Sequence, residues 1–281
     1  MAQTYSILSD LRANAGAPMQ RVLPQPGGPL AVTTLTMCDV PMSFGSGCIG
    51  RAAVNIVANR LLAMGATPRY VSVGAVVDCD INAQLLEVVD RSMADAAVQA
   101  EMEFASGQSV QGLSEPHTGL DLTLTAMGVM PPDMEMGMEH IDRGDVIIAL
   151  AEVGTYGTAV AASRRNMLTV IEGADGNALC DGVHALMRDV TPVKCLIFPE
   201  HGVNEALHAI AAEHPSLQTD YHAIPVNEAV RAAADILGVD ADDMPCAGTM
   251  LAVVRGSDAA RALKALHSAP YCGSAAVIAH L

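Results

Sequence analysis

Residues 44–74 read F-G-S-G-C-I-G-R-A-A-V-N-I-V-A-N-R-L-L-A-M-G-A-T-P-R-Y-V-S-V-G, a glycine-rich loop followed by a helical pattern and an apolar run. The glycines allow the loop to turn sharply and to approach other groups closely. Apolar residues recur at helical spacing from Ile49, and Gly65 with Pro68 indicates where the helix ends. The β-branched run Tyr70–Val77 predicts a buried strand. We expect the rest of the chain to fold around this loop, helix and strand.

Strand and helix patterns alternate along the remaining sequence. The predicted strands are Leu30–Met37, Leu120–Met130, Val146–Ala151, Val193–Phe198, Met250–Val254 and Ala275–Ala279, and residues 104–112 are predicted as a strand that leads into a loop. The predicted helices are Ser6–Ala13, Asn82–Glu103, Gly157–Met167, Asn177–Arg188, Val203–Ala212, Val226–Leu237 and Ser257–Leu266. Because both halves of the chain show this rhythm, we predict an α/β protein with two domains, 29–145 and 146–281, preceded by an arm or linker over 1–28.

Composition excludes several classes of protein. The formal net charge of −16 and an aromatic content of 3% argue against nucleic-acid binding, which needs a basic surface and often stacking rings. No apolar run approaches the roughly 20 residues of a membrane span, and the first residues do not form a signal peptide. The seven cysteines show no C-x-x-C pairing, which is typical of a reducing cytoplasm. We therefore expect a cytoplasmic protein with no nucleic-acid or membrane partner.

The segment G-A-T-P-R-Y-V-S at 65–72, after the glycine loop and helix, resembles the signature of the aminoimidazole-ribonucleotide-synthetase superfamily. Within it, the pattern is closest to the hydrogenase-maturation carbamoyl dehydratase (HypE) family. M-R-D-V-T at 187–191, the segments 201–212 and 224–240, and G-T-M-L-A-V-V at 248–254 extend the similarity in the same order. The resemblance implies a two-domain synthetase-like fold that forms a homodimer by strand pairing of its N-terminal domains. It also implies a nucleotide between the domains, with ATP and Mg²⁺ as cofactors, and a partner among the maturation proteins.

The sequence departs from this family at the positions that would hold Mg²⁺ against the phosphates. Mg²⁺ requires hard oxygen ligands, and the family supplies them mainly as aspartates. The matching positions here are Leu35, Cys48, Arg60, Gln108 and Ala247. The family's terminal P-R-x-C motif does not occur in these 281 residues either. We therefore predict no ATP or Mg²⁺ cofactor for this chain.

Ten residues at or near family positions are candidates for contacting a ligand or a metal. The ligand-binding candidates are Asn55, Asn59, Arg60, Gln108, Ser109, Arg188, Asp189 and His201, and the thiols that could bind a metal are Cys38 and Cys48. Each has a structural alternative: the asparagines can hold a neighbouring loop, and His201 can fill space. Arg188 and Asp189 can be a solvated helix end, and the cysteines can be buried thiols without zinc-like spacing. No residue is assigned as catalytic, and none is firmly assigned as a metal ligand.

These observations favour a divergent HypE-like protein that is a dimeric binding or assembly protein and not an ATPase, related to hydrogenase or metallocofactor maturation. One alternative is an enzyme that uses the cleft between the domains for a different small molecule. Another is an ATP-dependent family member whose site has been rebuilt from other residues. The sequence leans away from an enzyme, because most of the residues that the family uses for ATP and Mg²⁺ are replaced.

Overall fold

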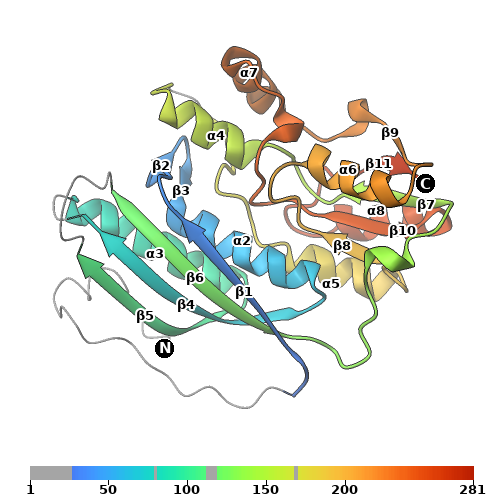
Figure 1. The fold of residues 1–281 in the computed structure, drawn as a ribbon, viewed down its shortest axis with the longest axis horizontal. Coiled ribbons are helices and arrows are strands. Elements are labelled where there is room, and N and C mark those ends of the chain that lie inside the picture. Colours follow the sequence, from blue (N-terminus) through green and yellow to red (C-terminus); the bar gives the residue numbers. More distant parts are fainter. Residues whose placement is uncertain (1–26, 79–80, 112–118, 168–169) are drawn as a thin grey trace.

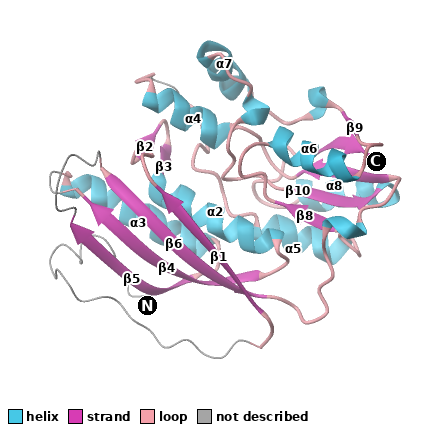
Figure 2. Ribbon diagram, viewed as in Figure 1, coloured by secondary structure: helices cyan, strands magenta, loops and turns pink. Residues whose placement is uncertain are grey.

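The computed structural model describes residues 27–78, 81–111, 119–167 and 170–281, and its elements fall around two main sheets (Figures 1 and 2). The predicted helix Ser6–Ala13 and most of the expected arm, 1–28, lie outside these residues. None of the described helices combines the length and the apolar character needed to cross a membrane.

The first sheet has four strands in the order β1-β6-β4-β5. These are β1 (Leu30–Met37), β4 (Thr67–Val77), β5 (Glu103–Gln111) and β6 (Leu120–Val129). β6 is antiparallel to both of its neighbours, whereas β4 and β5 run parallel, with helix α3 (Ala83–Gln99) between them in the chain. Helices α2 (Ile49–Ala63) and α3 lie on one face of this sheet (Figure 1).

The other face of the first sheet carries exposed apolar side chains. Leu30 and Val32 alternate along β1 with the buried residues Ala31 and Leu35, as period-two geometry requires. Val76 pairs with Val110 across β4 and β5, so these two side chains share a face. The exposed residues on this open face include Leu30, Val32, Thr34, Thr36, Thr123, Val76, Glu103, Gln108 and Val110.

Helix α2 is the central element of the fold. Twelve of its fifteen residues are buried, because it packs on the first sheet, on α3 and on parts of the second half of the chain. Gly50 permits the close approach to α3: a Cβ there would lie 2.5 Å from the carbonyl oxygen of Val89. The glycine loop before α2 forms a small hairpin, β2 (Ser43–Phe44) and β3 (Gly47–Cys48), with Gly45 in the turn at a φ of 58°.

The second sheet has five antiparallel strands in the order β8-β10-β7-β11-β9. They are β7 (Asp145–Ala149), β8 (Cys195–Ile197), β9 (Gln218–Thr219), β10 (Leu251–Arg255) and β11 (Ala276–His280). The helices of this half are α4 (Thr155–Arg164), α5 (Cys180–Asp189), α6 (Val203–Glu213), α7 (Glu228–Leu237) and α8 (Ala259–His267). Single helical turns are η1 (Met138–His140), η2 (Tyr221–Ala223), η3 (Ala241–Asp243) and η4 (Gly256–Asp258).

The sequence predicts most of these elements, with one clear error and three omissions. The helix predicted over Asn82–Glu103 ends at Gln99, because Glu101 takes a φ of 56° and Glu103 begins β5. Asn82 is its N-cap as expected, accepting a hydrogen bond from the backbone N–H of Gln84 at 2.8 Å. The short strands β2, β3 and β9 are not predicted. The strands of the first sheet all precede residue 130, and those of the second sheet begin with β7. We therefore propose two domains that meet at the start of β7, over 29–145 and 146–281.

Candidate functional site

Two buried asparagines on α2 hold the glycine-containing loops of the second half of the chain. The Nδ2 group of Asn59 donates to the carbonyl oxygens of Asn177 and Ala247, both at 2.9 Å. Its Oδ1 accepts from the backbone N–H of Leu179 at 2.9 Å. The Nδ2 group of Asn55 donates to the carbonyls of residues 175 and 176, at 3.2 and 2.9 Å. Both asparagine side chains are fully buried, and their hydrogen bonds connect α2 to the loops of the second half of the chain. Their role in the structure is therefore to hold these segments together.

Arg60 joins the first sheet to the loop before α6. Its Nη1 donates to the carbonyl oxygen of Thr34 at 2.7 Å, and its Nη2 forms an ion pair with Glu200. Thr34 directly precedes Leu35, one of the positions where the resemblance implies an acidic group. The guanidinium of Arg60 is therefore bound to protein groups on two sides.

Cys48 lies at the start of α2, among polar groups that the sequence did not single out. Its backbone N–H donates to Oδ2 of Asp175 at 3.2 Å, and its Sγ accepts from the hydroxyl of Ser92 at 3.0 Å. Arg51 places its Nε 3.8 Å from the same carboxylate. Burial raises the pKa of Asp175, although these partners oppose the shift. Nothing in its local sequence pattern distinguishes Asp175, whose partners are more than 120 residues earlier.

A cavity of about 390 Å³ lies between β1, α4 and the segment after η3. Cys38 and His201 both line it, together with Tyr156, Arg164 and Glu200. The Cys38 thiol is exposed at the rim, and some burial together with the charge of Asp121 raises its pKa. Its thiol is therefore protonated at neutral pH and is a weak nucleophile. The cavity brings Cys38 and His201 to one place, but Cys48 is not among its lining residues.

Gln108 and Ser109 lie on β5, the edge strand of the first sheet, and line neither the cavity beside β1 and α4 nor the groove between α5 and α8. Gln108 is exposed on the open face, and Ser109 is half-buried and paired with Ala75 on the opposite face. The structure thus separates this pair from the other ligand-binding candidates.

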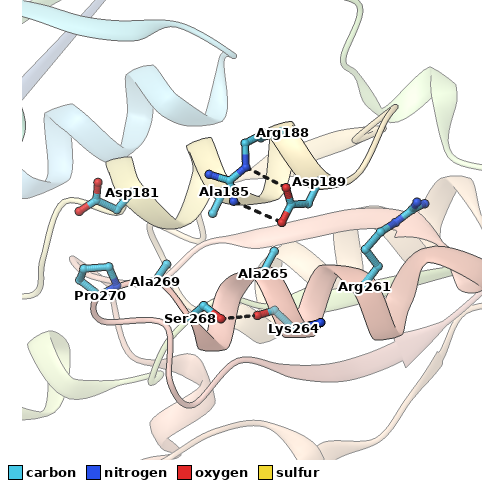
Figure 3. Close-up of a pocket in the computed structure, with 10 residues that line it drawn as sticks. All are labelled: Asp181, Ala185, Arg188, Asp189, Arg261, Lys264, Ala265, Ser268, Ala269 and Pro270. Atoms are coloured by element: carbon cyan, nitrogen blue, oxygen red, sulfur yellow. Dashed lines mark hydrogen bonds and ion pairs between the residues drawn. The ribbon is translucent and has the colours of Figure 1, made fainter.

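Arg188 and Asp189 lie at the end of α5, in a groove of about 670 Å³ between α5 and α8 (Figure 3). The Nε of Arg188 donates to Oδ1 of Asp189 at 2.8 Å, and both side chains are exposed. This bond holds the pKa of Asp189 below its usual value. Arg261 and Lys264 of α8 line the same groove, and Arg261 is itself paired with Asp258. The groove mixes both signs of charge, and it is separate from the cavity beside Arg60 and His201.

A buried lysine forms a further charged cluster that the sequence did not indicate. Lys194 donates to Asp142 at 2.8 Å and to the fully enclosed Asp145 at 2.7 Å. The hydrogen bond from Lys194 holds the pKa of Asp142 below its usual value. This cluster anchors the start of β7 to the segment before β8. Within the part of the chain that the structure describes, no group of three or more His, Cys, Asp or Glu side chains is arranged to hold a metal ion.

The amino-acid sequence is similar to a known protein family and to several characterised proteins. Residues 19–130 match the family described as AIR synthase related protein, N-terminal domain. Carbamoyl dehydratase HypE of Escherichia coli K12 is 29% identical over 259 residues, which span 90% of this chain and 76% of that protein. A putative hydrogenase expression/formation protein of Methanocaldococcus jannaschii is 25% identical over 85% of this chain and 72% of its own length.

Solved structures agree with the sequence comparison. A crystal structure of the hydrogenase maturation protein HypE superposes with a TM-score of 0.83 at 26% identity, covering 92% of this chain and 81% of that one. A structure of HypE in complex with ATP gives the same TM-score and identity, over 78% of its chain. Thiamine-monophosphate kinase of Stenotrophomonas maltophilia shares the fold, with a TM-score of 0.67 at 17% identity, over 100% of this chain and 94% of that one. The expected synthetase-like α/β fold is confirmed.

Proposed function

Because the chain is an AIR synthase-related protein and a homologue of HypE over most of its length, we propose that it is a HypE-like maturation protein that does not hydrolyse ATP. It acts as a dimeric binding or assembly protein alongside hydrogenase or another metallocofactor pathway. Its relatives at 25–29% identity include carbamoyl dehydratases and hydrogenase expression/formation proteins, which supports this pathway. A partner among the maturation proteins is part of the proposal.

The observation that carries the proposal is the ion pair between Arg60 and Glu200. A triphosphate needs a divalent metal held by carboxylates, because the phosphate charges are otherwise unfavourable in a partly enclosed site. Here the carboxylate of Glu200 is bound by Arg60, and Arg60 also donates to the backbone beside the apolar Leu35. Glu200 is therefore engaged, and the first strand contributes no acidic group at Leu35.

The open face of the first sheet supports assembly into a homodimer. Leu30, Val32 and Val110 are each about half exposed, at 51%, 48% and 51%. Pairing two copies through this face would remove these exposed apolar side chains from water, as a two-fold interface does.

Nucleotide binding and turnover test the proposal directly. Purified protein with Mg-ATP should show no phosphate release above background and no shift in melting temperature. A ligand at about a thousand times its Kd stabilises a protein by about 4 kcal/mol, which such a scan detects easily. A HypE that binds ATP, measured in parallel, is the positive control. Mg-dependent stabilisation by several degrees, or turnover, would overturn the proposal in favour of a rebuilt ATP site.

A further inference from the structure

The cavity between β1 and α4 has an apolar interior. Leu35 of β1, Ile56 of α2, Val160 of α4 and Met244 line it, and the first three are more than nine-tenths buried. Its volume of about 390 Å³ is in the range of sites that hold small organic molecules. An aliphatic or aromatic body would contact the interior without requiring any charged partner.

Two polar groups from α4 enter the same cavity. Tyr156 is 92% buried, since only 8% of it is exposed, and its hydroxyl forms no hydrogen bond with another residue that the structure describes. Its ring packs edge-to-face on Phe44, with 5.5 Å between the ring centroids, so the hydroxyl is fixed in position. The hydroxyl is therefore available to donate a hydrogen bond to an acceptor atom of a ligand in the cavity.

Arg164 supplies the positive charge at the rim of the cavity. Its Nη2 donates to the backbone carbonyl of Asp39 at 2.8 Å, which anchors the guanidinium beside β1. Within the described part of the chain, Arg164 forms no ion pair, whereas Glu200, the acidic residue of the lining, is paired with Arg60. The guanidinium of Arg164 therefore has no acidic partner at the cavity among the described residues. It lies close enough to Tyr156 that its charge partly offsets the increase in the pKa of the phenol that burial causes.

We propose that this cavity binds a small organic carboxylate with an apolar body, without a metal ion. Arg164 and the hydroxyl of Tyr156 hold the carboxylate, and the apolar interior holds the body. A guanidinium and a neutral hydroxyl suit a single negative charge, because charge-assisted hydrogen bonds to a carboxylate are short and directional. The inference rests on the proposed function, since it requires that the cleft is not an Mg-ATP site.

Binding of 4-phenylbutyrate and octanoate, each compared with its amide, tests the inference. Titration calorimetry and ligand-observed NMR are run with a chelator present. Each acid should bind at least about tenfold more tightly than its amide, the size of one charge-assisted hydrogen bond. Arg164→Gln should remove that difference, and Tyr156→Phe should weaken binding of the acid several-fold while keeping the ring packed on Phe44.

Arg165→Gln is the matched control. Arg165 is adjacent to Arg164 on α4, but its Nη1 donates to the carbonyl of Leu237 at 2.9 Å and it does not line the cavity. Circular dichroism and melting temperature confirm that each variant is folded. Equal binding of acid and amide, equal loss in the Arg165 variant, or no binding of either acid at millimolar concentration overturns the inference. These outcomes are independent of the Mg-ATP measurement, so failure here leaves the proposed function to its own test.

Discussion

Replacing Asn59 by alanine separates a structural role for this residue from a ligand-binding role. The side chain is fully buried on α2, and it makes three hydrogen bonds of 2.9 Å to backbone groups 118 to 188 residues later in the sequence. If these bonds hold the two halves of the protein together, Asn59→Ala should destabilise the fold whether or not any ligand is present.

The expected magnitude follows from the groups that the substitution leaves behind. Two carbonyl oxygens, of Asn177 and Ala247, and the N–H of Leu179 lose their partner. Each buried group without a hydrogen bond costs about 1–3 kcal/mol. Water entering the vacated space recovers part of this, so we expect a loss of about 3–6 kcal/mol in the free energy of unfolding. Such a loss is a large fraction of the roughly 5–15 kcal/mol that stabilises a typical domain.

Asn55→Ala, one helical turn earlier, is the matched control. This substitution removes two hydrogen bonds, compared with three for Asn59→Ala. It also deletes a buried Oδ1 atom that has no hydrogen-bond partner among the described residues. Its cost should therefore be smaller, about 1–3 kcal/mol. Urea denaturation followed by circular dichroism, at one fixed protein concentration, measures both variants. A change below about 1 kcal/mol for Asn59→Ala, or a larger loss for Asn55→Ala, would refute the structural assignment.

Three further outcomes follow from the structure. Val32→Lys should convert the proposed dimer to a monomer in light scattering, whereas Val98→Lys, at a 75% exposed position on α3, should not. An unchanged mass for both variants would exclude the open face as the interface. Burial raises the pKa of Asp242 to about 6 from 3.8, so its stabilising contribution is present below about pH 4 and is lost as the pH rises through 6. Asp242→Asn should thus raise the free energy of unfolding by up to about 3 kcal/mol more at pH 8 than at pH 4, and a pH-independent difference would contradict this. Gly50→Ala should destabilise the fold by about 1–3 kcal/mol, because its Cβ would lie 2.5 Å from the carbonyl of Val89, and a melting temperature equal to wild type would contradict the packing.

The elements that the sequence predicts well are those whose ends are set locally. Strand β1 matches its predicted bounds because its alternation of β-branched and apolar residues is uninterrupted, and α2 ends where Gly65 stops it. The end of α3 is mispredicted because Ala100 to Glu103 still favour a helix on propensity. The turn at Glu101 is set by the pairing of β5 with β4, a contact between strands that a helical pattern does not reveal.

The candidate site could be predicted only in part, because its contacts connect distant segments. Asn55 and Asn59 are conspicuous in the sequence as polar residues one turn apart, but their partners lie more than 115 residues away. Tyr156 and Arg164 have no distinguishing pattern at all, and only the packing of α4 beside β1 brings them to the cavity. Polar residues within a helix can be recognised from the sequence, whereas the groups they contact depend on the tertiary fold.

The substitutions at the cleft are physically coupled, which bears on whether a nucleotide site could be recovered from this chain. Arg60 is bound on one side by Glu200 and on the other by the carbonyl of Thr34. An aspartate at position 60 would place its charge beside Glu200 and near that carbonyl, and like charges in a partly buried site repel. Leu35 is more than nine-tenths buried and lines the adjacent cavity, so a carboxylate there would be desolvated without a metal to offset the cost. Either reversion alone is therefore unfavourable before any metal binds. Together the residues at 35, 60 and 200 disfavour a metal site, and Mg-ATP binding would require changing them as a set.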